Sequence, residues 1–136
     1  YLSADPQLRP GIDIEMVSSR DPSFAQSFFT EDEQSIATNA ENPDEALTVI
    51  WAIKEATSKA LGVGARVDFR NITVSQQGQG WSVSFKGDAR TRADEIGATL
   101  PQVSVDVQNS RIIARVLLPT GVLQEGLAKY STEVRA

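Results

Sequence analysis

The sequence predicts an α+β fold in which a mainly antiparallel sheet packs on one long central helix. A wide apolar stripe with helical spacing runs through residues 43–61, as in a largely buried helix. Residues 66–85 and 103–118 each alternate apolar and polar side chains around a short turn, as antiparallel hairpins do. Strands do not alternate regularly with helices, which argues against a parallel sheet. The 136 residues suit a single domain, residues 1–136, with one core.

The first strand is expected directly after a polar, linker-like segment at residues 1–10. Apolar and acidic residues alternate along residues 11–16, so the strand has two unlike faces. Its apolar face carries Ile12, Ile14 and Met16, and its acidic face carries Asp13 and Glu15. Taken alone, the acids could simply be solvated on a surface strand.

Two short helices are predicted next. Asp21 and Pro22 are typical of a helix start, with the aspartate as cap and the proline in the first turn. Thr30 and Glu33 have the spacing of a capping box, which predicts a second helix ending near Thr38. Capping is a sufficient structural role for Glu33.

The long helix is expected to begin at Pro43, with Asn42 as its cap, and to end at Gly62 and Gly64. The strands expected after it lie at residues 66–75, 81–85, 103–107 and 112–118, with a helix at residues 88–97. Residues 119–136 are weakly patterned and are expected to form a last helix or a disordered tail.

One face of the long helix carries Trp51, Glu55 and Lys59, four residues apart. If this face packs on the acidic side of the first strand, the carboxylates of Glu55, Asp13 and Glu15 meet the Lys59 ammonium. Such a cluster suits a divalent cation and a phosphate. The simpler alternative is an ion pair between Glu55 and Lys59 along the helix, worth roughly 0.2–0.5 kcal/mol.

Composition excludes several kinds of chemistry. The chain has no cysteine and no histidine, so thiolate sites, histidine bases and the usual zinc ligands are excluded. A bound metal should be a hard cation with oxygen ligands, Mg2+ before Zn2+. The net charge of -5 argues against nucleic acid as a partner, and no apolar run is long enough for a membrane span. The lack of cysteine fits a reducing compartment, so a cytoplasmic location is expected.

Three stretches together resemble the 4'-phosphopantetheinyl transferases: residues 11–15 (GIDIE), 28–33 (FFTEDE) and 51–62 (WAIKEATSKALG). The family shows Gly-hydrophobic-Asp, Phe-Thr/Ser-x-x-Glu and Trp-x-x-Lys-Glu-Ala-x-x-Lys in this order. The resemblance implies a phosphopantetheinyl transferase fold. It also implies a Mg2+-dependent enzyme that moves the phosphopantetheine arm of coenzyme A to a serine of an acyl or peptidyl carrier protein. Fatty acid or polyketide biosynthesis would be its setting.

By motif position, the resemblance implies roles for particular residues. Asp13 and Glu55 would bind Mg2+, with Glu15 as a third ligand, as in the surfactin-type branch. Lys59 would contact the phosphates of coenzyme A and, with Glu55, serve catalysis. The remaining expected site residues are Lys54, Gly62 and Gly64 as coenzyme A contacts and Glu33 as a group that helps deprotonate the carrier serine.

The chain departs from the family at a Ser-x-Ser-His motif, whose histidine contacts coenzyme A. Ser104 fits that motif, but Val107 stands at the histidine position. The chain therefore resembles the C-terminal catalytic half of a two-half enzyme, and a homo-oligomer or a second half-domain is expected to complete the site. A catalytically degenerate domain that binds carrier protein or has a structural role in a larger synthase is the alternative. A plain α+β binding module with solvated acids is a third interpretation.

Carrier proteins of this kind are usually acidic, so a locally basic docking surface is expected. Arg20, Arg66 and Arg70 are the arginines that we expect to contribute to it.

Overall fold

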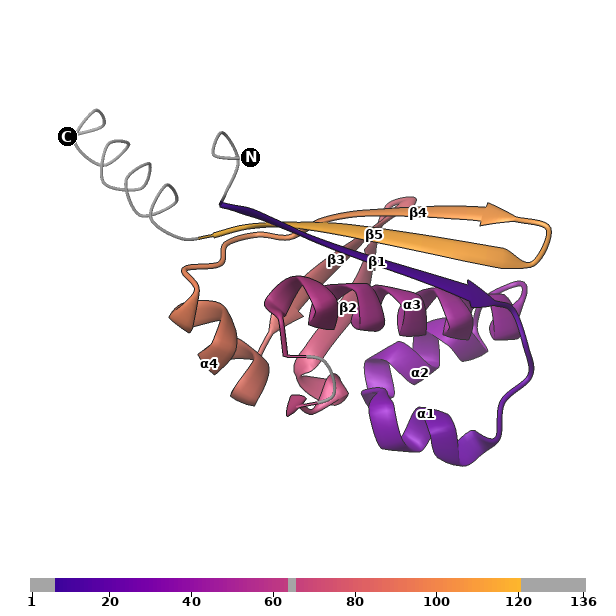
Figure 1. Ribbon diagram of the computed structural model, residues 1–136. Coiled ribbons are helices and arrows are strands. Elements are labelled where there is room, and N and C mark those ends of the chain that lie inside the picture. Colours follow the sequence, from indigo (N-terminus) through magenta and orange to yellow (C-terminus); the bar gives the residue numbers. More distant parts are fainter. Residues whose placement is uncertain (1–6, 64–65, 121–136) are drawn as a thin grey trace.

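The computed structural model describes residues 7–63 and 66–120 (Figure 1). The elements are, in chain order, β1 (Leu8–Met16), α1 (Pro22–Phe28), α2 (Glu31–Thr38), α3 (Pro43–Leu61), the 3-10 helix η2 (Phe69–Asn71), β2 (Ile72–Gln77), β3 (Gly80–Phe85), α4 (Gly87–Glu95), β4 (Gln102–Gln108) and β5 (Arg111–Pro119). Within the described ranges, no helix combines the length and apolar character that crossing a bilayer requires.

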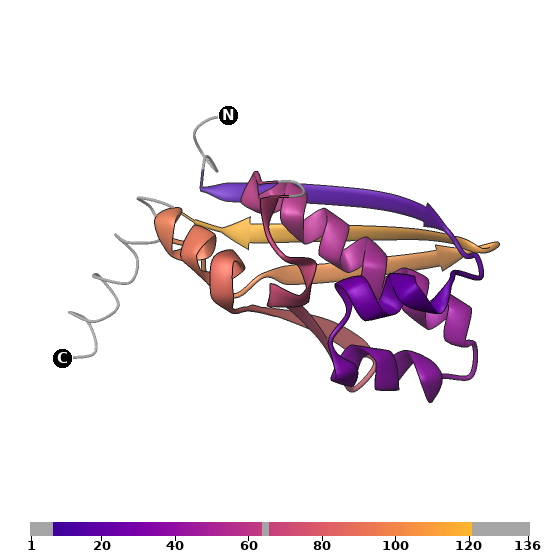
Figure 2. The same ribbon diagram turned by 90° about the horizontal axis from the view of Figure 1, so that it is seen from below.

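Both sheets are antiparallel, which confirms the predicted α+β class. The larger sheet has the strand order β1-β5-β4, and the smaller one pairs β2 with β3. Helix α3 packs across one face of the larger sheet and contacts α2 and β2 on its other side (Figures 1 and 2). The core lies between these layers and includes the fully buried side chains of Ile50, Ile53, Leu61, Ile72, Ile112 and Leu118.

Strand β1 lies on α3 at an unusually close contact. A Cβ atom on Gly11 would overlap the carbonyl oxygen of Ala56, so only glycine allows the strand and the helix to approach this far. Because side chains alternate along a strand, the two acids that follow Gly11 on the same face, Asp13 and Glu15, are directed toward α3. The close contact thus brings the acidic face of β1 to the middle of the long helix.

The other face of β1 is uncovered. Ile12, Ile14 and Met16 are 49%, 59% and 58% exposed, respectively. These residues face away from α3 on the outer surface of the three-stranded sheet, where Leu117 of β5 is also exposed. The sheet therefore has one packed face and one apolar, open face.

The helix boundaries follow the predicted capping residues. The Asp21 carboxylate accepts from the backbone N–H of Ser23 at 2.9 Å, and Asn42 accepts from that of Glu45 at 3.1 Å. Thr30 and Glu33 form the reciprocal capping box. Helix α3 ends at Gly62, whose φ of 78° is the left-handed conformation typical of a helix C-terminus.

Two predicted boundaries are wrong. Residues 8–10, assigned to a linker, belong to β1 because they pair with residues 117–119 of β5. The strand expected from residue 66 begins at Ile72, because the Asp68 carboxylate accepts from the backbone N–H of Arg70 and starts a 3-10 turn. Gly64 and most of the expected tail, residues 121–136, lie outside the described residues.

Candidate active site

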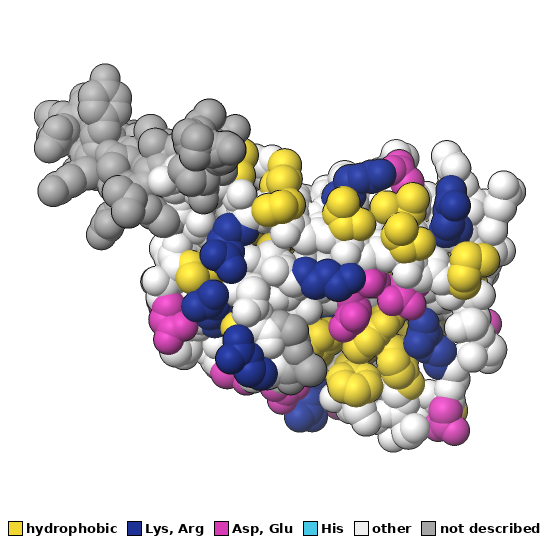
Figure 3. All heavy atoms as spheres, viewed as in Figure 1, with side chains coloured by type: hydrophobic (Ala, Val, Ile, Leu, Met, Phe, Trp, Pro, Cys, Tyr) yellow, Lys and Arg dark blue, Asp and Glu magenta, His cyan; other side chains and the backbone are white. Residues whose placement is uncertain are grey.

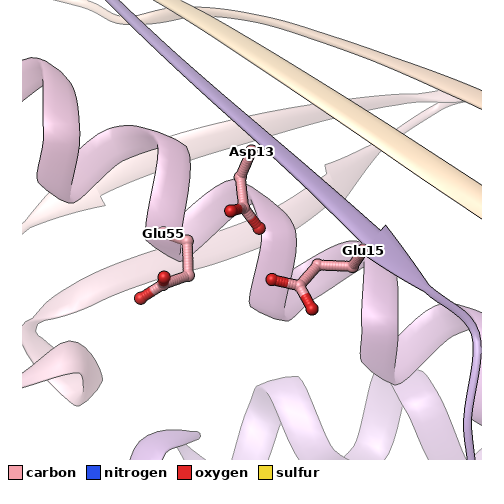
Figure 4. Close-up of side chains that lie close together, drawn as sticks. All are labelled: Asp13, Glu15 and Glu55. Carbon is pink, nitrogen blue, oxygen red and sulfur yellow. The ribbon is translucent and has the colours of Figure 1, made fainter.

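Three carboxylates meet where β1 crosses α3 (Figure 4). Asp13 and Glu15 extend from the strand and Glu55 from the helix, and one oxygen of each lies within 4.8 Å of the other two. Glu55 directly precedes Ala56, the residue against which Gly11 packs. The close contact between strand and helix therefore places the acids together, as the two sequence patterns predict.

Lys59 completes this acidic cluster of Asp13, Glu15 and Glu55. Its Nζ donates to Asp13 Oδ1 at 3.1 Å and to the backbone oxygen of Ile12 at 2.9 Å. Its side chain is 50% exposed, so the ammonium also faces solvent. Among the described residues, Lys59 does not form the alternative ion pair with Glu55. Its ammonium pairs with Asp13 of β1 instead.

Burial and a neighbouring like charge raise the proton affinity of Glu15 and Glu55. Partial burial, with the neighbouring Asp13 carboxylate next in effect, raises the pKa of Glu15 to about 7, and Arg20 opposes this shift. Partial burial and Asp13 likewise raise the pKa of Glu55, against the effect of Lys59. For Glu15 and Glu55, burial and the neighbouring carboxylate therefore outweigh the positive charges of Arg20 and Lys59.

The donor set fits a hard divalent cation. Asp13 Oδ2 is buried and has no hydrogen-bond partner among the described residues, which is costly for a carboxylate oxygen. A cation among the three carboxylates would bind this oxygen and remove the repulsion between the acids. Oxygen-only ligands of this kind suit Mg2+.

Lys54 and Glu33 lie elsewhere, as a buried ion pair of 2.9 Å with no exposed side-chain surface. The Lys54 ammonium also donates to the backbone oxygens of Phe69 and Ile72, both at 2.6 Å. The Glu33 carboxylate accepts from the backbone N–H groups of Thr30 at 2.8 Å and Val74 at 2.7 Å. The contacts expected of Lys54 with coenzyme A and of Glu33 with a carrier serine therefore find no support, because their partners are already in place and solvent is excluded.

An aromatic cluster, which sequence reasoning did not assign to the site, lies next to the acids. Trp51, one turn before Glu55, has its ring centroid 4.8 Å from that of Phe24 and 5.2 Å from that of Phe28. Phe28 is 36% exposed, and Arg20 connects the two groups because it stacks on Phe24 at 4.6 Å and lies 3.5 Å from Glu15. In Figure 3 this face shows hydrophobic side chains directly beside the acidic ones. The four-residue spacing of Trp51 and Glu55, which puts both on one face of α3, is the sequence feature that predicts an aromatic side chain beside the acids.

Comparison with known proteins gives the fold and the family. The structure superposes on the holo-[acyl-carrier-protein] synthase (AcpS) of Neisseria meningitidis with a TM-score of 0.73 and 24% identity, covering 82% of this chain and 97% of that one. The corresponding enzyme of Helicobacter pylori, in complex with coenzyme A, gives a TM-score of 0.67 and 22% identity over 80% of this chain and 98% of that one. The fold is therefore that of the holo-acyl-carrier-protein synthases.

Proteins similar to this chain in sequence point to the same family as the structural neighbours. A holo-[acyl-carrier-protein] synthase of Shewanella baltica is 33% identical over 98 residues, 70% of this chain and 77% of the relative. Fatty acid synthase subunit alpha of Candida parapsilosis is 31% identical over 102 residues, 70% of this chain but only 5% of that much longer protein. The family model described as the 4'-phosphopantetheinyl transferase superfamily matches residues 9–116. The chain belongs to this superfamily, which confirms the family and the class of transferase that the three motifs indicate.

Proposed function

We propose that this chain transfers the 4'-phosphopantetheine arm of coenzyme A to a serine of an acyl carrier protein and uses Mg2+ to do so. The observation that carries the proposal is the meeting of three carboxylates within 4.8 Å of one another, beside the Lys59 ammonium. Relatives named for acyl-carrier-protein and fatty acid synthesis, and a structural neighbour in complex with coenzyme A, support the substrates. They favour a carrier protein of fatty acid synthesis over a peptidyl carrier.

Asp13, Glu15 and Glu55 would hold the Mg2+ ion, as their oxygen ligands and the unpartnered Asp13 oxygen suggest. When bound, Mg2+ supplies positive charge to the pyrophosphate of coenzyme A. Lys59 adds its ammonium, which is half exposed and adjacent to the acids, and can turn toward the leaving phosphate. Gly62, at the exposed end of the same helix, lies close enough to Lys59 to belong to the same phosphate site.

The transfer forms a bond between the carrier serine oxygen and the phosphorus that bears the pantetheine arm. The bond from that phosphorus to the bridging oxygen breaks, and 3',5'-ADP leaves with the electron pair. The serine proton passes to a carboxylate of the acidic cluster, directly or through water. Glu33 is not needed for this step.

The direct test is a transfer assay with coenzyme A, Mg2+ and an apo acyl carrier protein, in which the mass of the carrier reports the transfer. Glu55→Gln should reduce the rate at least about 100-fold, because it removes a charged cation ligand. Glu45→Gln, at a half-buried position ten residues before Glu55 on the same helix, is the matched control and should leave the rate unchanged. Unchanged transfer by Glu55→Gln would refute the cation assignment.

We further propose that a second copy of this chain completes the site. Val107 occupies the position where the family motif has a histidine, so another segment must supply that contact. The open apolar face of the sheet is available for such a copy, because three large side chains of β1 are about half exposed there, on the strand that carries Asp13 and Glu15. A cavity of about 420 Å³ near Ile12, Arg115 and Leu117 opens on this face.

Self-association can be measured by light scattering after size exclusion. The wild-type chain should elute as an oligomer, and Ile14→Lys, which places a charge on the apolar face, should give a monomer with reduced transfer activity. A monomeric wild type that becomes active only with an added polypeptide segment would show that a second half-domain, rather than a second copy, completes the site. A chain that binds the carrier protein and transfers nothing under any of these conditions would be the degenerate domain.

Among the arginines expected to dock an acidic carrier, Arg20 is placed best. It lies between Glu15 and the aromatic cluster, of which Phe28 is exposed, at the rim of the site. Arg70 is paired with Asp68 at 3.0 Å, and Arg66 donates to backbone carbonyls at the end of α3. We therefore propose Arg20 and Phe28 as the part of this face that meets the carrier.

A further inference from the structure

Arg20 is the side chain that links the acidic cluster to the aromatic cluster. It lies in the connection between β1 and α1, at residues 17–21, which has no regular secondary structure. Its Nη2 atom lies 3.5 Å from Glu15 Oε1, and its guanidinium group stacks on the Phe24 ring at 4.6 Å. Any event that moves the Glu15 carboxylate therefore acts on an arginine at the edge of the aromatic cluster.

The bonding of Arg20 in this position is incomplete. Its Nε atom is buried and has no hydrogen-bond partner among the described residues, which costs free energy. The 3.5 Å between its Nη2 atom and Glu15 Oε1 is longer than the roughly 2.7–2.9 Å of a strong charge-assisted hydrogen bond. By contrast, Lys59 donates to Asp13 at 3.1 Å and to a backbone oxygen at 2.9 Å. Arg20 is thus the more weakly held of these two cations at the acidic cluster.

A divalent cation would compete with Arg20 for Glu15. The Glu15 side chain points toward Asp13 (Figure 4), and one oxygen of each acid in the cluster lies within 4.8 Å of the other two. A cation bound there carries two charges against the single charge of the guanidinium group, so it attracts Glu15 more strongly and repels Arg20. Lys59 does not conflict with the cation in the same way, because it uses Asp13 Oδ1 and leaves Oδ2 without a partner.

The aromatic cluster offers Arg20 a second position. Phe24 and Phe28 are in edge-to-face contact, with ring centroids 5.4 Å apart, and Phe28 is 36% exposed. Arginine stacks on aromatic faces, so a movement from Phe24 toward Phe28 keeps a favourable contact while the contact with Glu15 is lost. The released charge then lies on the surface proposed to meet the carrier protein.

We propose that Arg20 is a positioning residue through which cation binding strengthens carrier binding. The cation displaces the guanidinium group from Glu15, and the free guanidinium group pairs with an acidic side chain of the carrier protein. The inference rests on the proposed function, since it takes the cation and the acyl carrier protein as ligands. Because coupling between two ligands is reciprocal, the carrier should strengthen cation binding by the same factor.

Cation affinity tests the competition. In calorimetric titrations with Mg2+ at pH 8, Arg20→Gln should bind the ion about tenfold more tightly than the wild type, because a positive charge beside the site is removed. Arg90→Gln is the matched control, since Arg90 is exposed on α4 and pairs with Asp94 at 3.2 Å, and it should leave the Mg2+ affinity unchanged. An arginine that only supports the fold would give unchanged or weaker Mg2+ binding when removed, and that result overturns the proposal.

Carrier affinity, measured without coenzyme A so that no transfer occurs, tests the coupling. Mg2+ should strengthen the binding of an apo acyl carrier protein to the wild type by at least about fivefold. Glu15→Gln removes the carboxylate that holds Arg20, so it should bind the carrier without Mg2+ as tightly as the wild type does with Mg2+. Arg20→Gln should bind the carrier weakly with and without Mg2+.

Glu55→Gln separates this effect from a general change of charge. It removes the same charge from the acidic cluster, but among the described residues Glu55 forms no ion pair with Arg20. In the absence of Mg2+ it should therefore bind the carrier more weakly than Glu15→Gln does. Equal carrier affinity of the two variants would mean that only the total charge matters and would overturn the role of Arg20.

Two further results overturn the coupling. A Mg2+ effect that persists in Arg20→Gln would mean that the ion attracts the carrier by its own charge, and carrier binding that is absent or does not respond to Mg2+ leaves nothing to couple. Because these titrations involve no transfer, they separate the coupling from the proposed function. Coupled binding in a chain that transfers nothing supports the role of Arg20 and refutes the transferase, whereas normal transfer without coupling supports the transferase and overturns the role of Arg20.

Discussion

Asp13 of β1 and Lys59 of α3, 46 residues apart in the chain, form an ion pair of 3.1 Å that joins the strand to the helix. The pair uses only one of the two Asp13 oxygens, and the other is buried without a partner among the described residues. Lys59 therefore compensates only part of the charge of the acidic cluster. The remaining negative charge is what makes the place suited to a divalent cation.

Gly11→Ala should destabilise the fold and open the site. The added methyl group would overlap the Ala56 carbonyl, so β1 must move away from α3. Overpacking of this kind costs about 1–3 kcal/mol, and here the obstacle is rigid backbone. Chemical denaturation should show the loss, and calorimetry should show weaker Mg2+ binding. Gly80→Ala, at an exposed position where the added Cβ would make only an ordinary contact of 3.6 Å with the Gln77 carbonyl, is the control. A Gly11→Ala chain as stable as the control would show that the strand–helix contact is looser than described.

The stability of the metal-free chain should fall as pH rises. The folded-state pKa of Glu15, about 7, lies above the ordinary value of 4.5, so between these values the folded state binds more protons than the unfolded state. Stability is therefore lost as pH rises from about 4.5 to about 7. In EDTA, the wild-type Tm should decrease from pH 5 to pH 8 by more than that of Glu15→Gln. Equal decreases would mean that Glu15 has an ordinary pKa.

Mg2+ binding should show the opposite pH dependence. The ion must displace the proton that Glu15 holds below pH 7, so the apparent affinity should rise with pH by up to about tenfold per unit and level off above pH 7. Calorimetric titrations between pH 5.5 and 8 measure this directly. In Glu15→Gln the slope should be smaller. An affinity independent of pH over this range would exclude Glu15 as a ligand.

Lys54→Met should be strongly destabilising although it changes no proposed site residue. It leaves the Glu33 carboxylate buried without its counter-ion, which typically costs about 3–5 kcal/mol. The double change Lys54→Met with Glu33→Gln should recover part of this loss, because the amide oxygen can still accept from the backbone. Guanidinium denaturation measures the free energy of unfolding of the single and the double variant, and Lys86→Met, at an exposed position, is the control. A loss below about 1 kcal/mol for Lys54→Met would contradict the buried pair.

Local patterns in the sequence predict much of this structure. Alternation places Asp13 and Glu15 on one face of β1, and the four-residue spacing places Glu55 and Lys59 on one face of α3. The helix starts follow from capping residues whose hydrogen bonds involve neighbours two or three residues away. These features depend on nearby residues only, so they can be predicted without the fold.

Contacts between distant segments could not be predicted in this way. Helical spacing does not show that Lys54 is buried, because its partners Glu33, Phe69 and Ile72 come from other elements. Arg9 falls in the segment that the sequence predicts to be a linker, because its pairing partner Leu118 is more than 100 residues away in the chain. The meeting of Arg9 and Arg92 at the C-terminal end of α3 therefore emerges only when β1, α3 and α4 are seen together.

The most direct test of the account is calorimetric titration of the chain with Mg2+ in the presence of coenzyme A. We expect the wild type to bind one ion per chain, Asp13→Asn and Glu55→Gln to bind none in the same concentration range, and the control Glu45→Gln to bind as the wild type does. Undiminished Mg2+ binding in both Asp13→Asn and Glu55→Gln would contradict the claim that these carboxylates hold the catalytic ion.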